Sequence, residues 1–315
     1  MMKMLTAPAM EEIRRWMHRN ARPLELALWS QRKEGGSRDA VLGELALYQN
    51  EDGGFGNALE PDSWNPDSTP YTTRYALTVL QDLGCAQVDR PMVQRALGFL
   101  TQTEHASDLG WYFNIPTNND HPHAPWWSWQ GQSDEVESVG LTAELAAHVL
   151  RIAPPSSPAY GMALGFADRL FDRFLTAEKF GDMGLGGYCA LLEVVLELGL
   201  ATRWDCPTLE THLRALVNAS IVRDHAQWLH YGVRPSNYIK NPNSLWLAGN
   251  EDILQTELDY LIDTRPVGAV WGIPWSWFDL NERYAKAFAI SENWWRGIKA
   301  LEAVELLSKF GRVEG

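Results

Sequence analysis

The chain has 315 residues, of which 45% are hydrophobic and 21% charged, and its net charge is −13 at neutral pH. This length and apolar content allow one large buried core or two modest ones, and they exclude an intrinsically disordered chain. The acidic balance argues against a nucleic-acid partner, because binding to phosphate groups requires clustered lysine and arginine side chains.

Helical periodicity dominates the sequence, and no segment shows the alternation that is typical of a half-buried strand. We therefore expect an all-α protein. The predicted helices cover residues 9–19, 22–32, 37–50, 69–84, 90–103, 138–152, 159–178, 187–200, 207–220, 250–263 and 286–310. Thr69-Pro70 and Cys206-Pro207 are typical helix starts with an early proline, and Gly84, Gly199 and Gly311 stand where helices should end.

A turn of distinctive sequence follows the third predicted helix, where residues 49–56 read Gln-Asn-Glu-Asp-Gly-Gly-Phe-Gly. Gly53 and Gly54 end a helix and permit a left-handed turn. Gln49 is placed to bond free backbone groups at the helix end, and the ring of Phe55 can stack over the glycine.

This turn resembles the QW repeat of the terpenoid cyclase and protein prenyltransferase superfamily. Residues 72–77, which follow it, are similar to the inner helix after a QW turn. The resemblance implies an α/α toroid, in which helical hairpins close into a ring around a central cavity.

Weaker copies of the pattern occur further along the chain. Residues 99–112 contain Gly110-Trp111-Tyr112, residues 174–188 contain Gly186-Gly187-Tyr188, and residues 261–272 form a more degenerate copy. We interpret each copy as a helix, a glycine-aromatic loop and a second helix. Stacking in a ring would bury the hairpin faces, so we expect one toroid domain of five or six hairpins over residues 1–315, in preference to an open solenoid or a bundle.

A rigid acidic loop, residues 57–68, comes directly after the turn. It carries Glu60, Asp62 and Trp64, and two prolines stiffen it. Glu60 or Asp62 is a candidate general acid, or the two are an acid and base pair, and Trp64 is a candidate substrate contact. The alternative is ordinary turn chemistry, because aspartate, asparagine and serine beside proline commonly form turns.

A second polar loop, residues 118–129, contains two histidines around a proline. His121 and His123 are candidates for proton transfer, and with Asp120 they could hold a metal ion, but this spacing is a weak metal signal. Bonding of the imidazoles to loop carbonyl groups is the alternative. The tryptophans of this loop are candidate substrate contacts: Trp126, Trp127 and Trp129.

Two further segments carry candidate residues. Asp134 and Glu135 precede the helix at 138–152, where a carboxylate crowded by its neighbours could keep its proton and act as an acid. The alternative is helix capping, with Ser133 as the cap. Near the C-terminus, aromatic and cationic side chains suggest a further binding loop: Trp275, Trp277 and Arg283.

The motifs that give the resembled family its chemistry are missing. The sequence has no DxDD-type acid motif and no aspartate-rich diphosphate motif, and Asp205-Cys206 does not have the spacing of the prenyltransferase zinc site. We therefore predict no metal site and no particular cofactor.

Three classes of function stay open: an enzyme that uses a carboxylate acid on an isoprenoid, a carbohydrate-active lyase or hydrolase, and a non-catalytic toroid that binds a ligand or partner. The resemblance favours the first. In each case the expected ligand is a small molecule or a partner, and the sequence does not predict an oligomeric state.

The expected location is the cytoplasm. No apolar run approaches the roughly 20 residues of a membrane-spanning helix, and the N-terminus lacks the apolar core of a signal peptide. Cys85, Cys189 and Cys206 are an odd number without a CxxC pair, which indicates reduced thiols.

Overall fold

The computed structural model describes residues 2–314, apart from the side chains of Thr103 and His230. Over this range the chain is mostly helical, with twelve α-helices and six short 3-10 helices, which confirms the all-α prediction. None of the helices between residues 2 and 314 combines the length and the apolar content that a membrane span requires. The chain forms two compact units, residues 45–216 and residues 1–44 together with 217–315.

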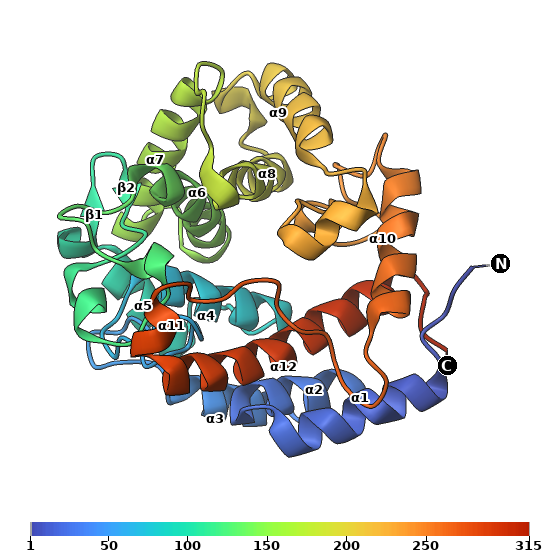
Figure 1. The fold of residues 1–315 in the computed structure, drawn as a ribbon. Helices are drawn as coiled ribbons and strands as arrows, with labels where there is room; N and C mark the ends of the chain where they lie inside the picture. The colour runs from blue at the N-terminus through green and yellow to red at the C-terminus, as the bar shows by residue number, and fades with distance from the viewer. Residues whose placement is uncertain (1, 315) are drawn as a thin grey trace. The chain divides into compact units, whose positions relative to one another are not determined.

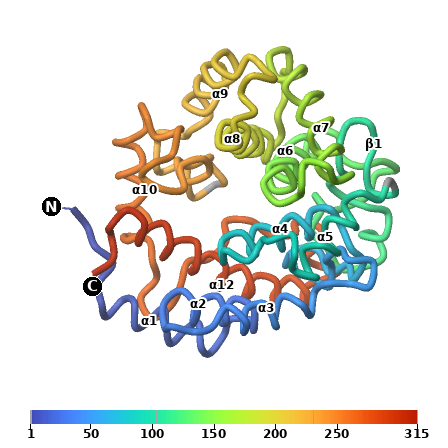
Figure 2. The backbone as a smooth tube through the Cα atoms, turned by 180° about the vertical axis from the view of Figure 1, so that it is seen from behind, coloured from blue at the N-terminus to red at the C-terminus, as the bar shows by residue number. Residues whose placement is uncertain are grey.

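The unit of residues 45–216 is built from two rows of helices. One row contains α4, α6 and α8, with α6 in contact with both of the others, and the second contains α5, α7 and α9 (Figures 1 and 2). The helices are α4 (Pro70–Asp82), α5 (Pro91–Leu100), α6 (Glu135–Ile152), α7 (Pro158–Phe174), α8 (Gly181–Glu197) and α9 (Cys206–Ser220).

The other unit is organised around its last helix, α12, which packs against α1 and α2. Its helices are α1 (Ala7–Asn20), α2 (Pro23–Lys33), α3 (Arg38–Ala46), α10 (Glu251–Thr264), α11 (Leu280–Arg283) and α12 (Ala285–Lys309). The two ends of the chain pair with each other, since Leu5 N donates to Arg312 O at 2.8 Å and Glu314 N donates to Leu5 O at 3.0 Å. The Arg312 guanidinium is buried and donates to Gln255 Oε1 at 2.7 Å on α10.

The predicted helix boundaries follow from local chemistry. α4 begins at Pro70, and the Thr69 side chain accepts from Thr72 N in a capping box. Gly84, Gly199 and Gly311 follow the ends of α4, α8 and α12 with φ of 63°, 69° and 66°. Because this left-handed conformation strains any residue with a Cβ, glycine ends these helices as the sequence predicts.

The segments between the helices contain short elements that the sequence did not reveal. The two-residue strands β1 (Ala106–Ser107) and β2 (Gly110–Trp111) pair antiparallel. The 3-10 helices are η1 (Thr103–His105), η2 (Pro116–Asp120), η3 (Pro125–Trp127), η4 (Ala201–Arg203), η5 (His225–His230) and η6 (Pro235–Asn237). All are too short to produce a periodic pattern.

One of the predicted loops is wrong. Gly186, Gly187 and Tyr188 do not form a glycine-aromatic loop, because α8 begins at Gly181 and runs through them. A Cβ at Gly187 would lie 2.4 Å from Gly140 O of α6. Glycine is needed here for the close approach of two helices, which sequence alone does not distinguish from a turn.

Two of the other copies of the pattern share a contact. Trp111 Nε1 donates to Leu100 O at the end of α5, and Trp271 Nε1 donates to Leu261 O in the last turns of α10, both at 2.9 Å. In both cases an indole N–H binds a carbonyl group near the end of the preceding helix.

Replacement of Gly187 by alanine tests the close packing of α6 and α8. The added methyl group would meet backbone atoms, so we expect Gly187→Ala to lower the free energy of unfolding by about 1–3 kcal/mol. Gly186→Ala is the matched control, since no atom lies within 4 Å of its added Cβ. There we expect stabilisation by about 0.5–1 kcal/mol, because glycine is a poor helix former. Urea unfolding measures both; equal effects of the two substitutions would contradict this packing.

Candidate functional site

The Gln49–Gly56 turn ties together the end of α3 and the side of α5. Gln49 Nε2 donates to Gly53 O at 2.8 Å and to Met92 O at 2.9 Å, and Gln49 Oε1 accepts from Arg95 at 2.6 Å. Gln49 therefore bonds carbonyl groups of the turn and of α5, and not free backbone groups at the end of α3 as we predicted. A Cβ at Gly53 would lie 2.4 Å from Arg95 O, so the turn and α5 approach more closely than a side chain permits.

The backbone of Phe55 connects this turn to the first residues of α4. Phe55 N donates to Thr73 Oγ1 at 3.1 Å, and Phe55 O accepts from Thr69 N at 3.0 Å and from the Thr72 hydroxyl. The turn therefore fixes the first turn of α4, which carries Tyr71.

The acidic loop after the turn is held in a strained conformation. Asn57 and Ala58 have φ of 56° and 58°, in the left-handed region, which costs Ala58 about 1–2 kcal/mol and which asparagine adopts more readily. Glu60 and Asp62 follow and are only 3% and 1% exposed. Glu60 Oε2 accepts from Asp62 N at 2.6 Å, which closes a tight turn, and Trp64 Nε1 donates to Pro61 O at 3.1 Å.

The two polar loops that the sequence singled out pair through their backbones. Trp64 N donates to Pro122 O at 2.9 Å, and Ala124 N donates to Asp62 O at 2.8 Å. Side chains add to this pairing, since Asn65 Nδ2 donates to Asn118 Oδ1 at 2.8 Å. Segments that are about 60 residues apart in sequence thus form one structure.

His123 is bonded within its own loop. Its Nδ1 lies 2.6 Å from His121 O, and its Nε2 lies 3.0 Å from Ser128 Oγ. The alternative that the histidines bond to loop carbonyl groups is therefore confirmed for His123. Within residues 2–314, no three histidine, cysteine, aspartate or glutamate side chains are grouped as a metal site would require.

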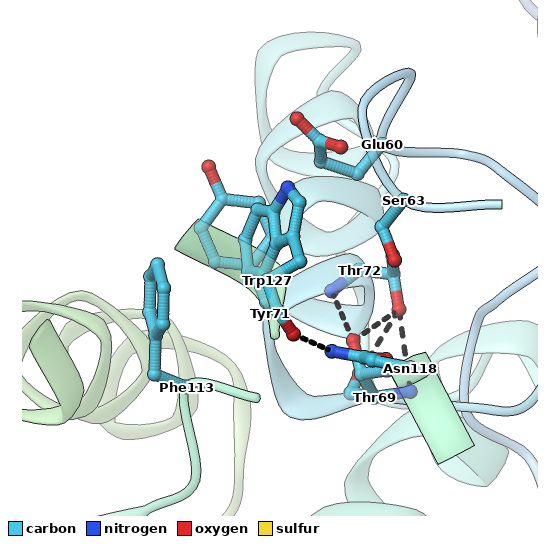
Figure 3. Close-up of a pocket in the computed structure, with 8 residues that line it drawn as sticks. All are labelled: Glu60, Ser63, Thr69, Tyr71, Thr72, Phe113, Asn118 and Trp127. Carbon is cyan, nitrogen blue, oxygen red and sulfur yellow. Dashed lines mark hydrogen bonds between the residues drawn. The ribbon is translucent and has the colours of Figure 1, made fainter. Parts of the chain in front are cut away.

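A pocket lies between the acidic loop, the start of α4 and the second loop (Figure 3). Its lining residues are Glu60, Ser63, Thr69, Tyr71, Thr72, Phe113, Asn118 and Trp127. The space around these residues is about 190 Å³ when the open solvent at the mouth is included, but the gap between the walls is too narrow for a water molecule. A ligand therefore has to push the walls apart.

Three aromatic rings form one wall of the pocket. Phe113 and Trp127 are stacked with ring centroids 4.7 Å apart and an interplanar angle of 17°. Tyr71 packs edge-to-face against both, at 4.5 Å from Trp127 and 5.6 Å from Phe113. The three rings therefore pack together as one aromatic cluster.

Two polar groups in the pocket make no hydrogen bond to any described residue. Trp127 is 3% exposed, and its indole N–H has no acceptor within residues 2–314. The Ser63 hydroxyl is also without a bonding partner in this part of the chain. The hydroxyl groups of Thr69 and Thr72, by contrast, bond to each other at 2.7 Å.

A polar network joins α4 to α6 behind Tyr71. The Arg74 guanidinium lies 4.6 Å from the Tyr71 ring centroid and 3.3 Å from the Glu144 carboxylate. One turn further along, His148 Nδ1 donates to Gln81 Oε1 at 2.6 Å. Burial, together with the charge of Arg74, lowers the pKa of His148 to about 3, so this imidazole is neutral.

The acidic residues before α6 have capping contacts. Asp134, not Ser133, is the N-cap, and its Oδ1 accepts from Val136 N and Glu137 N. The expectation for Ser133 is wrong, since its hydroxyl accepts from Phe113 N at 2.8 Å. Asp134 and Glu135 are exposed and do not line the pocket.

Glu137, in the first turn of α6, is the carboxylate of this segment with a shifted pKa. Burial raises the pKa of Glu137, while bonds from two backbone N–H groups oppose the shift. Its Oε1 accepts from Asp182 N at 2.9 Å at the start of α8. Glu137 thus joins α6 to α8 and lies outside the pocket.

The remaining candidate residues lie elsewhere. Trp126 is 37% exposed, and the Trp129 ring is tilted against Tyr112 at 6.3 Å. Trp275, Trp277 and Arg283 belong to the other unit. There Trp275 packs edge-on to Trp295, Trp277 is buried, and the Arg283 guanidinium lies 4.9 Å from the Tyr284 ring.

Of the predicted site residues, the pocket brings together Glu60 and Trp127. Asp62, Trp64 and His123 support it from the paired loops. Sequence reasoning missed Tyr71, Phe113 and Ser63. Tyr71 directly follows the predicted helix start Thr69-Pro70, and Phe113 directly follows a glycine-aromatic segment. An aromatic residue next to each of these predicted features was the sequence signal that could have indicated both residues.

Comparison of the chain with known protein families, with curated proteins and with solved structures finds no match.

The neutral state of His148 predicts how stability depends on pH. Its folded pKa lies below the unfolded value of about 6.5, so the stabilisation is complete above pH 6.5 and is lost as the pH falls toward 3. The loss is at most about 1.4 kcal/mol per pH unit. His148→Gln should remove this contribution to the slope. Urea unfolding of both proteins between about pH 7 and about pH 5 measures this contribution. Parallel pH profiles of the two proteins would contradict the prediction.

Proposed function

We propose that the chain is an enzyme in which Glu60 acts as a general acid on a small substrate. The observation that carries this proposal is that the carboxyl group of Glu60, 3% exposed, lines the same pocket as the rings of Tyr71, Phe113 and Trp127. A positioned carboxyl group can transfer a proton to a reacting atom. The aromatic rings beside it give the acid an apolar wall against which a hydrocarbon can pack.

The construction of the acidic loop supports this role. The left-handed residues Asn57 and Ala58 store strain just before Glu60, and backbone bonds to the second loop hold the residues after it. Strained conformations persist where the surrounding structure over-determines them, and they cluster at active sites. A rigid loop also keeps the acid in place before the substrate arrives.

An isoprenoid is the substrate class that we propose first. The resemblance of residues 49–56 to the QW repeat favours it, and so does the aromatic wall.

A sugar is the second candidate, which the polar part of the lining favours. Five of the eight lining side chains are polar, and Ser63 offers a hydroxyl group without a partner within residues 2–314. One ring face of Trp127 is covered by Phe113, however, which leaves less surface for the stacking that sugar sites use.

We also propose that the helical hairpins close into an α/α toroid. Within residues 45–216, the alternation of α4, α6 and α8 with α5, α7 and α9 supports this arrangement. The shared contacts of Trp111 and Trp271 support an underlying repeat. A cytoplasmic location is proposed as well, and the three free, buried cysteines support it.

Replacement of Glu60 by glutamine tests the general acid. The purified protein is incubated with a bacterial small-molecule extract, and substrate loss and product gain are followed by mass spectrometry. We expect Glu60→Gln to slow conversion by at least about 100-fold, since general acids contribute factors of about 10²–10⁴. Glu51→Gln, at an exposed carboxylate earlier in the chain, should convert at the wild-type rate.

Two results would count against the proposed function. If wild-type protein and Glu60→Gln convert the same compounds at the same rate, Glu60 is not the acid. If the wild-type protein converts nothing but retains a compound from the extract, the non-catalytic ligand-binding class is correct instead.

A further inference from the structure

We propose that the substrate atom which receives the proton of Glu60 is an oxygen, held by a hydrogen bond from the indole N–H of Trp127. This inference rests on the proposed function and sharpens it. It assigns the substrate to alcohols, ethers or epoxides and excludes a plain alkene.

The starting observation is a buried donor without an acceptor. Trp127 is 3% exposed, and its N–H has no acceptor within residues 2–314. The nitrogen is shielded from solvent, so bulk water does not reach the donor either. A buried donor without a partner costs about 1–3 kcal/mol, and the large majority of buried side-chain polar atoms in proteins are bonded. A ligand that brings an acceptor to this place removes that cost.

The direction of the donor is fixed by its surroundings. Phe113 is stacked on one face of the indole, and Tyr71 packs against it edge-to-face. Asn118 Nδ2 donates to Trp127 O at 2.9 Å, which also anchors the backbone. Figure 3 shows the indole nitrogen on the edge of the ring that is turned toward the Glu60 carboxyl group.

An oxygen fits this pair of groups because it has two lone pairs. One lone pair accepts the hydrogen bond from Trp127 N–H, and the other takes the proton of Glu60. In that step the O–H bond of Glu60 breaks, a new O–H bond forms on the substrate oxygen, and Glu60 is left as a carboxylate. The C=C bond of an alkene has no lone pair and leaves the indole donor unsatisfied. The Ser63 hydroxyl, in the same lining, can bond a second polar atom.

The test compares probes with and without an oxygen. Protein labelled with ¹⁵N at its tryptophans is titrated with geraniol, an isoprenoid alcohol, with myrcene, a hydrocarbon of the same carbon number, and with methyl β-glucopyranoside. The indole N–H signal of Trp127, assigned by sequential methods, should move with geraniol and not with myrcene. Because this signal is measured on the wild-type protein, the result does not depend on whether a variant folds.

Trp127→Phe removes the N–H and keeps an aromatic ring. We expect it to weaken geraniol binding about tenfold, the upper range for one hydrogen bond, and to leave myrcene binding unchanged. Trp204→Phe is the matched control, because Trp204 also packs against a phenylalanine, Phe171, but lies outside the pocket. It should bind every probe as the wild type does.

The possible outcomes separate this inference from the proposed function. A response to methyl β-glucopyranoside instead of geraniol supports the oxygen and overturns the isoprenoid. Unchanged geraniol affinity in Trp127→Phe overturns the inference, because the N–H then makes no bond to the ligand. The Glu60→Gln variant still tests the general acid independently. No movement of the Trp127 signal with either oxygenated probe also overturns it.

Discussion

The candidate site depends on the backbone pairing of two loops that are distant in sequence. Trp64 N donates to Pro122 O, and Ala124 N donates to Asp62 O. These two bonds lie between Glu60 on one loop and Trp127 on the other, so they determine that an acid and an indole donor share a pocket. Loops normally vary in position more than helices do. Here each loop serves as the other's support, and neither would be defined alone.

The support extends inward to regular structure through the Gln49–Gly56 turn. Its glycines let the turn lie directly against α5, and the backbone of Phe55 bonds the first residues of α4. Tyr71 stands one residue after Pro70, so its ring position follows from where α4 begins. The turn that resembles a QW repeat thus acts on the site indirectly. It sets the position of one aromatic wall, while the chemical groups come from the loops that follow.

The sequence predicted the helices well because their signals are local. Proline at helix starts and left-handed glycine at helix ends, as at Pro70 and Gly84, need no tertiary information. It failed at Gly187, since a glycine that admits a neighbouring helix looks the same in sequence as one that makes a turn. In the site, Glu60 and Trp127 were predicted from their loops, because acids and tryptophans are conspicuous. Phe113 was not, because it reaches the pocket only through its stacking on Trp127.

A comparison of Asp134 with Glu60 explains why we assign the acidic residue before α6 to helix capping and the buried one to the proposed chemistry. Asp134 is as acidic and as close to a helix as a catalytic residue would be, but it is exposed and bonds the helix's own N–H groups. Glu60 is buried, and the loop that carries it contains two residues in costly left-handed conformations. The buried indole N–H of Trp127, which has no acceptor within residues 2–314, adds a further cost. The net stability of a folded protein is only about 5–15 kcal/mol. Unfavourable contributions gathered at one pocket are therefore not explained by stability alone. Their coincidence at one pocket is therefore the strongest physical argument that the pocket, and not the capped helix beside it, is where the molecule acts.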